Sequence, residues 1–128
     1  MARPAHLTVF IADDSPPVAD MLVELIEAIG AVEVVGLGDS EEAALVAIRR
    51  LRPDVVVLDL QLRSGSGVNV IRAVRADPSL VGTRLFVTSS HSSEQMRAGC
   101  LELGADAYYD KVRDLPALAA RLAELARG

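Results

Sequence analysis

Asp54-Val55-Val56-Val57-Leu58-Asp59 is the stretch that decides the fold, because four consecutive apolar residues stand between two aspartates. A run that is apolar on both sides is typical of a strand in a parallel sheet whose two faces are covered by helices. Pro53 ends the helical pattern before this run, and a loop rich in Ser and Gly follows it. The stretch is therefore predicted to be the central strand of a sheet.

Strand-like runs and amphipathic helical patterns alternate five times along the chain. The predicted strands are residues 7–12, 33–37, 54–58, 83–89 and a short run around Tyr108 and Tyr109. The helix starts that we expect have N-caps or capping boxes at Ser15, at Asp39 with Glu42, at Ser92 with Gln95, and at Asp114. Parallel neighbours need right-handed crossovers, so five such units predict an α/β fold with a doubly wound, five-stranded parallel sheet.

Length and composition restrict the possible functions. The 128 residues fit one domain, residues 1–128, and 51% of them are hydrophobic, which is enough for a core. A net charge of −5 and scattered arginines argue against a nucleic-acid surface. The single cysteine, Cys100, excludes a disulfide framework and suits a reducing cytosol. No signal peptide or membrane span is evident, so we expect a cytoplasmic protein with no membrane contact.

Chemistry-bearing residues follow the predicted strands at the same end. They are Asp13 and Asp14, Asp59, Thr88, and Lys111, which is the chain's only lysine. Ligands of doubly wound sheets bind at the carboxyl ends of the strands. The aspartate pair could alone be a turn and helix cap, but its combination with a third carboxylate and an ammonium points to a shared site.

Three carboxylates held together repel one another unless a cation lies among them. Oxygen ligands without His or Cys indicate Mg²⁺, with Mn²⁺ as a possible substitute. An aspartate can accept a phosphoryl group as an acyl phosphate, and a metal, an ammonium and a hydroxyl would neutralise the phosphoryl oxygens. The sequence therefore predicts a site for a divalent cation and a phosphoryl group.

Four motifs in this order resemble the receiver domain of bacterial two-component response regulators, of the single-domain kind typified by the chemotaxis regulator. They are Ile11-Ala-Asp-Asp-Ser15, Val57-Leu-Asp-Leu60, Phe86-Val-Thr-Ser89 and Gly104-Ala-Asp-Ala-Tyr-Tyr-Asp-Lys111. The resemblance covers nearly the whole chain. It implies a flavodoxin-like sheet with strand order 2-1-3-4-5 and no output domain.

The resemblance also implies a role for each residue of the acidic pocket. Asp59 would be the phosphoacceptor, Asp14 a direct Mg²⁺ ligand, and Asp13 a ligand acting mainly through water. Gln61 would give its backbone carbonyl to the metal.

Three further residues would complete the site and its switch. Thr88 would donate its hydroxyl to the phosphoryl group, and Lys111 would pair with that group. Tyr108 would be the aromatic residue that swings inward as Thr88 moves, although it could instead be an ordinary packing residue. Gly67 stands where the family has the glycine that lets the loop after the phosphoacceptor turn.

The chain departs from the family pattern at several positions. Arg63 replaces a usual proline, so we expect a flexible, charged turn there. Val112 replaces the proline of a cis bond after Lys111, so we expect a trans bond and a differently shaped loop. Gln61 and Ser90 occupy positions that tune access of the hydrolytic water, and they leave the phosphate lifetime open. His91 fits a solvated loop residue better than a phosphoryl carrier.

The leading hypothesis is a stand-alone phosphoacceptor that is not a conventional enzyme, although it could dephosphorylate itself. It would receive its phosphoryl group from a sensor histidine kinase or a histidine phosphotransfer protein. It would signal to an unknown partner protein through residues 92–127, and a phosphate sink would have the same sequence. Two alternatives remain. A haloacid-dehalogenase-type phosphohydrolase would need a second Asp where this chain has Gln61, whereas a phosphate-independent interaction module is compatible with Arg63 and Val112.

Overall fold

Five parallel strands form one sheet in the order β2-β1-β3-β4-β5 in the computed structural model, which describes residues 6–91 and 93–128. The strands are β1 (Leu7–Ala12), β2 (Val32–Gly38), β3 (Val55–Asp59), β4 (Arg84–Ser89) and β5 (Ala107–Asp110). The helices are α1 (Pro16–Glu27), α2 (Glu41–Leu51), α3 (Gly67–Ala76), α4 (Glu94–Leu103) and α5 (Leu115–Arg127), with a 3₁₀ turn, η1, at Pro78–Leu80. The predicted fold and strand order are confirmed.

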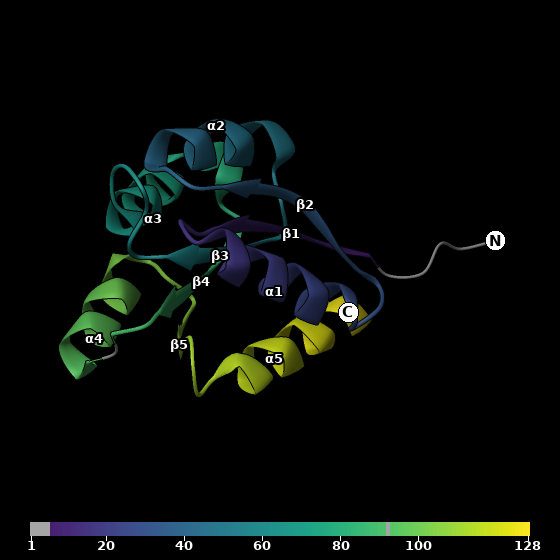
Figure 1. Cartoon of the computed structure of the whole chain (residues 1–128). Helices are drawn as coiled ribbons and strands as arrows, with labels where there is room; N and C mark the ends of the chain where they lie inside the picture. Colours follow the sequence, from purple (N-terminus) through teal and green to yellow (C-terminus); the bar gives the residue numbers. More distant parts are fainter. Residues whose placement is uncertain (1–5, 92) are drawn as a thin grey trace.

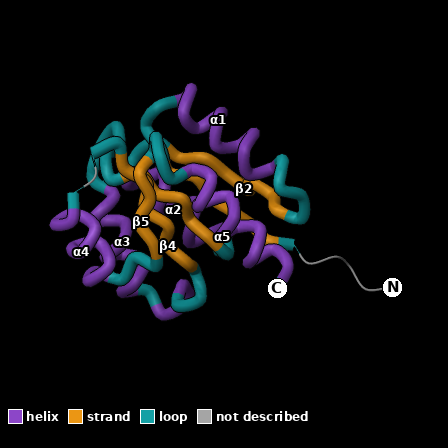
Figure 2. The backbone as a smooth tube through the Cα atoms, turned by 90° about the horizontal axis from the view of Figure 1, so that it is seen from below, coloured by secondary structure: helices purple, strands orange, loops and turns teal. Residues whose placement is uncertain are grey.

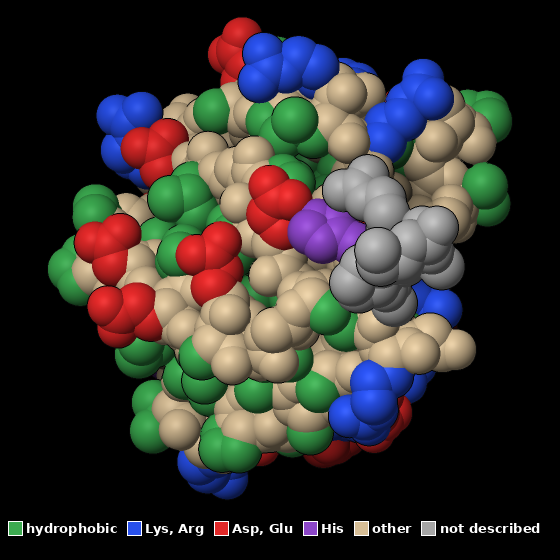
Figure 3. All heavy atoms as spheres, turned by 90° about the vertical axis from the view of Figure 1, so that its right-hand side faces the viewer, with side chains coloured by type: hydrophobic (Ala, Val, Ile, Leu, Met, Phe, Trp, Pro, Cys, Tyr) green, Lys and Arg blue, Asp and Glu red, His purple; other side chains and the backbone are tan. Residues whose placement is uncertain are grey.

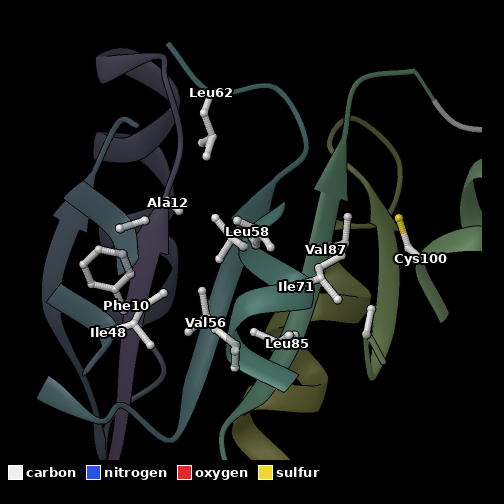
Figure 4. Packing of buried hydrophobic residues seen from close by; sticks show 14 of the residues in the cluster. Phe10, Ala12, Ile48, Val56, Leu58, Leu62, Ile71, Leu85, Val87 and Cys100 are labelled. Atoms are coloured by element: carbon white, nitrogen blue, oxygen red, sulfur yellow. The ribbon is translucent and has the colours of Figure 1, made fainter. Parts of the chain in front are cut away.

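Helices cover both faces of the sheet (Figures 1 and 2). On one face, α2, α3 and α4 pack against Phe10, Val56, Leu58, Leu85 and Val87, and Figure 4 shows these strand residues facing Ile48, Ile71 and Cys100. On the other face, α1 and α5 enclose the alternate strand residues, including Val9, Val57 and Phe86. Because successive side chains of a strand point to opposite faces, one apolar strand supplies both cores.

Strand β3 is buried along its whole length, as the apolar run predicted. It lies between β1 and β4, with Val57 paired to Ile11 on one side and to Phe86 on the other. Asp59 is its last residue and is only 5% exposed. A central strand with this burial gives its final carboxylate a fixed position at the edge of the sheet.

The helix starts agree with the predicted caps only in part. Ser15 caps α1 as expected. Ser40, not Asp39, caps α2, and its hydroxyl accepts the N–H of Ala43. Ser93 caps α4, whereas Ser92 lies outside the described residues. Both residues of each pair favour an N-cap, so sequence alone leaves the helix start ambiguous by one position.

Asp114 stands at the start of α5 but does not cap it with its side chain. Its Oδ2 atom instead accepts the N–H of Asp110 at 2.9 Å. Asp114 thus stands at the predicted position, but the prediction that its side chain caps α5 is wrong, because its carboxylate bonds to the end of β5.

Arg75 joins α3 to the starts of β4 and β5. Its guanidinium donates to Gly104 O at 2.8 Å, to Thr83 O at 2.9 Å, and to Asp106 Oδ2 at 2.8 Å. The same Asp106 oxygen accepts the N–H of Leu85 at 2.7 Å. The fork geometry of arginine satisfies two carbonyls and one carboxylate at once.

Charged side chains are dispersed on the side of the molecule that lies at the right in Figure 1. Figure 3 shows basic side chains around the edge of this face, with acidic groups between them and no basic stripe. Among the described residues, no helix has both the length and the apolar character to cross a membrane.

Candidate functional site

The carboxyl ends of four strands bring together the polar residues that the sequence analysis selected (Figure 1). Asp13 follows β1, Asp59 ends β3, Thr88 is the penultimate residue of β4, and Lys111 follows β5. These strands are consecutive neighbours in the sheet. The topology thus converts four distant sequence positions into one cluster.

Three carboxylates of this cluster suit a divalent cation. Asp13, Asp14 and Asp59 each offer one oxygen, and these oxygens all lie within 4.8 Å of one another. Asp13 and Asp59 are buried, whereas Asp14 is exposed. The Asp13 Oδ2 atom is buried and is paired with the ammonium of Lys111. An all-oxygen set with one open, exposed member fits Mg²⁺ or Mn²⁺, which keep several waters.

The ammonium of Lys111 lies between the two buried carboxylates. Its Nζ atom is 2.7 Å from Asp13 Oδ2 and 2.8 Å from Asp59 Oδ2. The Lys111 side chain is 13% exposed. Burial lowers the pKa of Lys111, but the two carboxylates outweigh burial and leave the pKa raised. Lys111 is therefore a fixed positive charge at this site.

Asp59 has both of its carboxylate oxygens engaged. Oδ1 accepts the N–H of Gln61 at 3.0 Å, and Oδ2 accepts from Lys111. Burial raises the pKa of Asp59, and the nearby charge of Asp13 adds to that effect. The hydrogen bonds from Lys111 and Gln61 oppose it, but the pKa remains above its ordinary value.

Thr88 is the direct partner of Asp59 in the pairing of β3 with β4. Its hydroxyl is buried and has no hydrogen-bond partner in the described part of the structure. Buried polar groups are rarely left unpaired, and such groups concentrate where a ligand completes them. This hydroxyl is available to a group bound next to Asp59.

The loop after Asp59 turns sharply at Gly67. The N–H of Gly67 donates to Leu60 O at 3.0 Å, and a Cβ atom there would lie 2.3 Å from Asp59 O. Glycine is required by space at this position, because no side chain could occupy it without moving the β3 backbone. This close approach is the physical reason for the glycine that the resemblance indicated.

Contacts that no sequence pattern revealed join this loop to the start of α2. Arg63 pairs with Asp39, with 3.0 Å between Nε and Oδ2, and its N–H donates to Asp39 O at 2.8 Å. Glu41 Oε1 accepts the N–H of Ser66 at 3.0 Å. The expectation of a flexible turn at Arg63 overlooked these bonds. Residues more than twenty positions apart showed no periodicity or motif that could reveal them.

The model of the family described as "Response regulator receiver domain" matches residues 9–123. The chain belongs to the response regulator receiver family. Phosphorylation of an aspartate and Mg²⁺ binding through an acidic pocket are typical of this family. In this receiver domain, Asp13, Asp14 and Asp59 form an acidic pocket at the carboxyl ends of the strands.

Known proteins similar to this receiver domain include regulators of several kinds. DNA-binding response regulator MtrA of Mycolicibacterium smegmatis is 37% identical over 103 residues, covering 80% of this chain and 43% of MtrA. A protein-glutamate methylesterase/protein-glutamine glutaminase of a Nocardioides species is 30% identical over 105 residues, covering 82% of this chain and 29% of that protein. The chain therefore spans less than half the length of either relative.

The solved signal receiver domain of response regulator NarL from Mycobacterium tuberculosis is similar along its whole length. It is 29% identical, with a TM-score of 0.86, and the match covers 98% of this chain and 99% of that domain. The likeness extends over the strands that carry the acidic pocket.

Tyr108 of the receiver domain lies inward. It is 6% exposed and belongs to the core beneath α2, α3 and α4. Its hydroxyl is 3.5 Å from His91 O, a long contact. His91 and Ser90 are exposed, which agrees with the solvated reading of His91. The inward position of Tyr108 is compatible with both readings of this residue, packing and switching.

The turn after Lys111 is built without a cis bond. Among the described residues no peptide bond is cis, which confirms the expected trans bond before Val112. Asp110 Oδ1 accepts the N–H groups of Val112 at 2.8 Å and of Arg113 at 3.0 Å. The side chain of Asp110 thereby shapes the turn that presents Lys111 to the acidic pocket.

Proposed function

We propose that this receiver domain is a phosphoacceptor that takes a phosphoryl group onto Asp59 with the help of Mg²⁺. The donor is a sensor histidine kinase or a histidine phosphotransfer protein. The observation that carries the proposal is the unpaired, buried hydroxyl of Thr88, which stands in register with Asp59 while Lys111 donates to Oδ2 of that carboxylate. A hydroxyl donor and an ammonium flanking one carboxylate are suited to a phosphoryl group bonded to it.

In the transfer, an oxygen of the Asp59 carboxylate bonds to phosphorus as the bond from phosphorus to the donor nitrogen breaks. The product is an acyl phosphate, and the released imidazole nitrogen keeps its electron pair. Bound Mg²⁺ would neutralise phosphoryl oxygens, held by Asp14, by Asp13 through water, by Asp59, and by the backbone carbonyl of Gln61. Lys111 would exchange its contact with Asp59 for one with the phosphoryl group.

The same proposal gives the phosphoryl group a way to change the surface. Thr88 would move to donate its hydroxyl to the new oxygens, and Tyr108 would respond to that movement. Such a charge-driven change biases a two-state element. Tyr108 lines a hollow of about 260 Å³ between α4 and the start of α5, together with Arg97 and Arg113. This hollow supports α4, β5 and α5 as the surface that carries the signal.

The output that we propose is contact of this surface with a partner protein, with the receiver acting as a stand-alone domain in the cytoplasm. The domain itself would bind no nucleic acid and catalyse no reaction on another molecule. Its net charge of −5 supports the absence of nucleic-acid binding.

The test is incubation of the protein with Mg²⁺ and acetyl phosphate, followed by intact mass measurement. We expect a labile mass increase of one phosphoryl group on the wild type and none on Asp59→Asn. A chelator should abolish the increase. An adduct that persists on Asp59→Asn would place the chemistry elsewhere, and the absence of any adduct despite measured Mg²⁺ binding would favour a phosphate-independent module.

A further inference from the structure

The loop that follows Asp59 is fastened to the junction between β2 and α2. Glu41 is the main attachment, because its Oε1 atom accepts the N–H of Ser66 at 3.0 Å and Nδ2–H of Asn69 at 3.1 Å. In return, the N–H of Glu41 donates to Ser64 O at 2.9 Å. One residue of α2 thus bonds to both the end of the loop and the first turn of α3.

The loop backbone approaches Glu41 so closely that it needs a glycine. Gly65 has φ +83°, and a Cβ atom there would lie 2.4 Å from Glu41 Cβ and 2.5 Å from Glu41 Oε1. The left-handed conformation and the missing side chain are both required at this point. The loop is therefore shaped to fit against Glu41.

Arg63 and Asp39 form the second attachment. The backbone N–H of Arg63 donates to Asp39 O at 2.8 Å, and the two side chains are 3.0 Å apart between Nε and Oδ2. Their side chains are 71% and 48% exposed, so the ion pair adds little to the free energy of unfolding. Its contribution is to hold a loop in one place.

The same junction also touches the other acidic loop. Gly38 O, one residue before Asp39, accepts the N–H of Asp13 at 3.0 Å. The segment from Gly38 to Glu41 consequently connects the loop of Asp13 with the loop that follows Asp59. It fixes the distance between two groups that the metal site must bring together.

We propose that Glu41 and the Arg63–Asp39 pair are positioning residues for the acidic pocket. By holding residues 60–66 in place, they keep the N–H of Gln61 on Asp59 Oδ1 and keep the backbone of Gln61 beside the cation. This inference rests on the proposed function for its metal and phosphoryl chemistry. The charge of the Arg63–Asp39 pair thereby takes the place of the proline that the family usually has at position 63.

The test measures Mn²⁺ affinity by the electron paramagnetic resonance signal of free Mn²⁺, and backbone hydrogen exchange in the metal-free protein. Glu41→Ala is expected to weaken Mn²⁺ binding by about ten-fold, as loss of a group that orients metal ligands does. Exchange of the Gln61 and Ser66 amides should accelerate in the same variant. Glu41→Gln retains an oxygen acceptor without the charge, so it should behave as the wild type in both measurements.

Arg63→Ala gives a sharper distinction, because simple electrostatics and positioning predict opposite results. Removal of a positive charge near three carboxylates should tighten Mn²⁺ binding, whereas loss of the attachment should weaken it by roughly two- to five-fold, the range that an exposed ion pair supplies. Arg72→Ala on the exposed side of α3 and Glu42→Ala in the first turn of α2 are matched controls for loss of each charge. Both should bind Mn²⁺ within about two-fold of the wild type, as distant surface substitutions do.

Each outcome bears on one idea. Tighter Mn²⁺ binding by Arg63→Ala, or unchanged binding by Glu41→Ala with faster exchange at Ser66, would overturn the positioning role. An equal loss of affinity in Glu41→Gln and Glu41→Ala would reduce the effect to charge and overturn it as well. If the wild type itself failed to bind Mn²⁺, the proposed function would fail. Protection of the Gln61 amide from hydrogen exchange would then alone decide whether Glu41 and the Arg63–Asp39 pair hold the loop on Asp59.

Discussion

Thr88 and Asp59 face each other across β3 and β4, and the hydroxyl of Thr88 has no hydrogen-bond partner in the described structure. An unpaired buried hydroxyl is a cost to the resting protein. The same hydroxyl is an advantage if a phosphoryl group arrives on Asp59. The Thr88 hydroxyl therefore lowers the stability of the resting protein but favours phosphoryl transfer to Asp59.

Thr88→Val keeps the shape of the side chain and removes the unpaired hydroxyl. We expect the free energy of unfolding to rise by less than about 1 kcal/mol, because the cost of the unpaired hydroxyl disappears and no existing hydrogen bond is lost. Phosphoryl transfer from acetyl phosphate should slow by about 100-fold, as when one donor to a developing anion is removed. Urea unfolding and the rate of mass increase check the two parts.

Thr88→Ser is the matched control, since it retains the hydroxyl and loses only a methyl group. Its transfer rate should stay much closer to that of the wild type. A Val variant that is phosphorylated as fast as the wild type would remove Thr88 from the chemistry.

Asp59→Asn should raise the thermal unfolding midpoint of the metal-free protein at neutral pH. Because burial raises the pKa of Asp59, the folded state holds that proton more tightly than the unfolded chain does. Ionisation of Asp59 therefore favours unfolding as pH rises through the folded-state value, and the cost disappears below the ordinary pKa near 3.8. Calorimetry over a series of pH values should show the difference between variant and wild type shrinking toward acid.

Metal supplies an independent check on the same residue. Mg²⁺ should stabilise the wild type by mass action and stabilise Asp59→Asn less. A variant that is less stable than the wild type at neutral pH without metal would contradict the raised pKa of Asp59.

Gly67→Ala should destabilise the protein by roughly 1–3 kcal/mol, the usual cost of overpacking. The added Cβ would meet Asp59 O at 2.3 Å and Leu60 Cα at 2.8 Å, and neither backbone atom can move without disturbing the end of β3. Mn²⁺ affinity should fall together with stability. Chemical denaturation and a metal titration measure both.

Gly99→Ala provides the opposite control within the same protein. Gly99 lies inside α4, and a Cβ there would meet no atom within 4 Å. The substitution should stabilise the protein by about 0.5–1 kcal/mol, because alanine is the better helix former. If both substitutions changed stability in the same direction, the crowding at Gly67 would not be the cause.

Arg75→Met should cost roughly 1–3 kcal/mol, because it removes three hydrogen bonds and leaves two carbonyls and the Asp106 carboxylate with fewer partners. Arg75→Lys should recover only part of the loss, since an ammonium lacks the planar fork. Both variants should bind Mn²⁺ normally, because Arg75 lies at the starts of β4 and β5 and not at their carboxyl ends. Denaturation midpoints and the metal titration test this separation.

The sequence predicted those parts of the molecule that follow from local patterns. The apolar run before Asp59 indicated a central strand, and the carboxyl end of that strand located Asp59 in the site. Once the strands were assigned, the parallel topology placed Asp13, Thr88 and Lys111 at the same edge of the sheet as Asp59. The strand order that makes their strands neighbours was implied by the resemblance to the receiver family. The roles of these residues in phosphoryl transfer remain predictions.

Interactions between loops could not be predicted in the same way. Glu41 has the composition of an ordinary first-turn helix residue, and nothing in its neighbours shows that it bonds to Ser66. Asp114 shows a related limit, because a carboxylate at a helix start can bond forward into the helix or backward to the preceding strand. These choices depend on how close two segments come in space, and no periodic pattern records that distance.

The position of Lys111 allows proteolysis to measure how often the acidic pocket opens. It is the only lysine, so a lysine-specific endoprotease has a single site, at the turn between β5 and α5. The Lys111 side chain is tied to Asp13 and Asp59, and a protease can engage it only after those ion pairs open. The rate of cleavage at Lys111 would therefore report how often its ion pairs with Asp13 and Asp59 open, and the protein would need no label. We expect Asp59→Asn to be cleaved faster than the wild type.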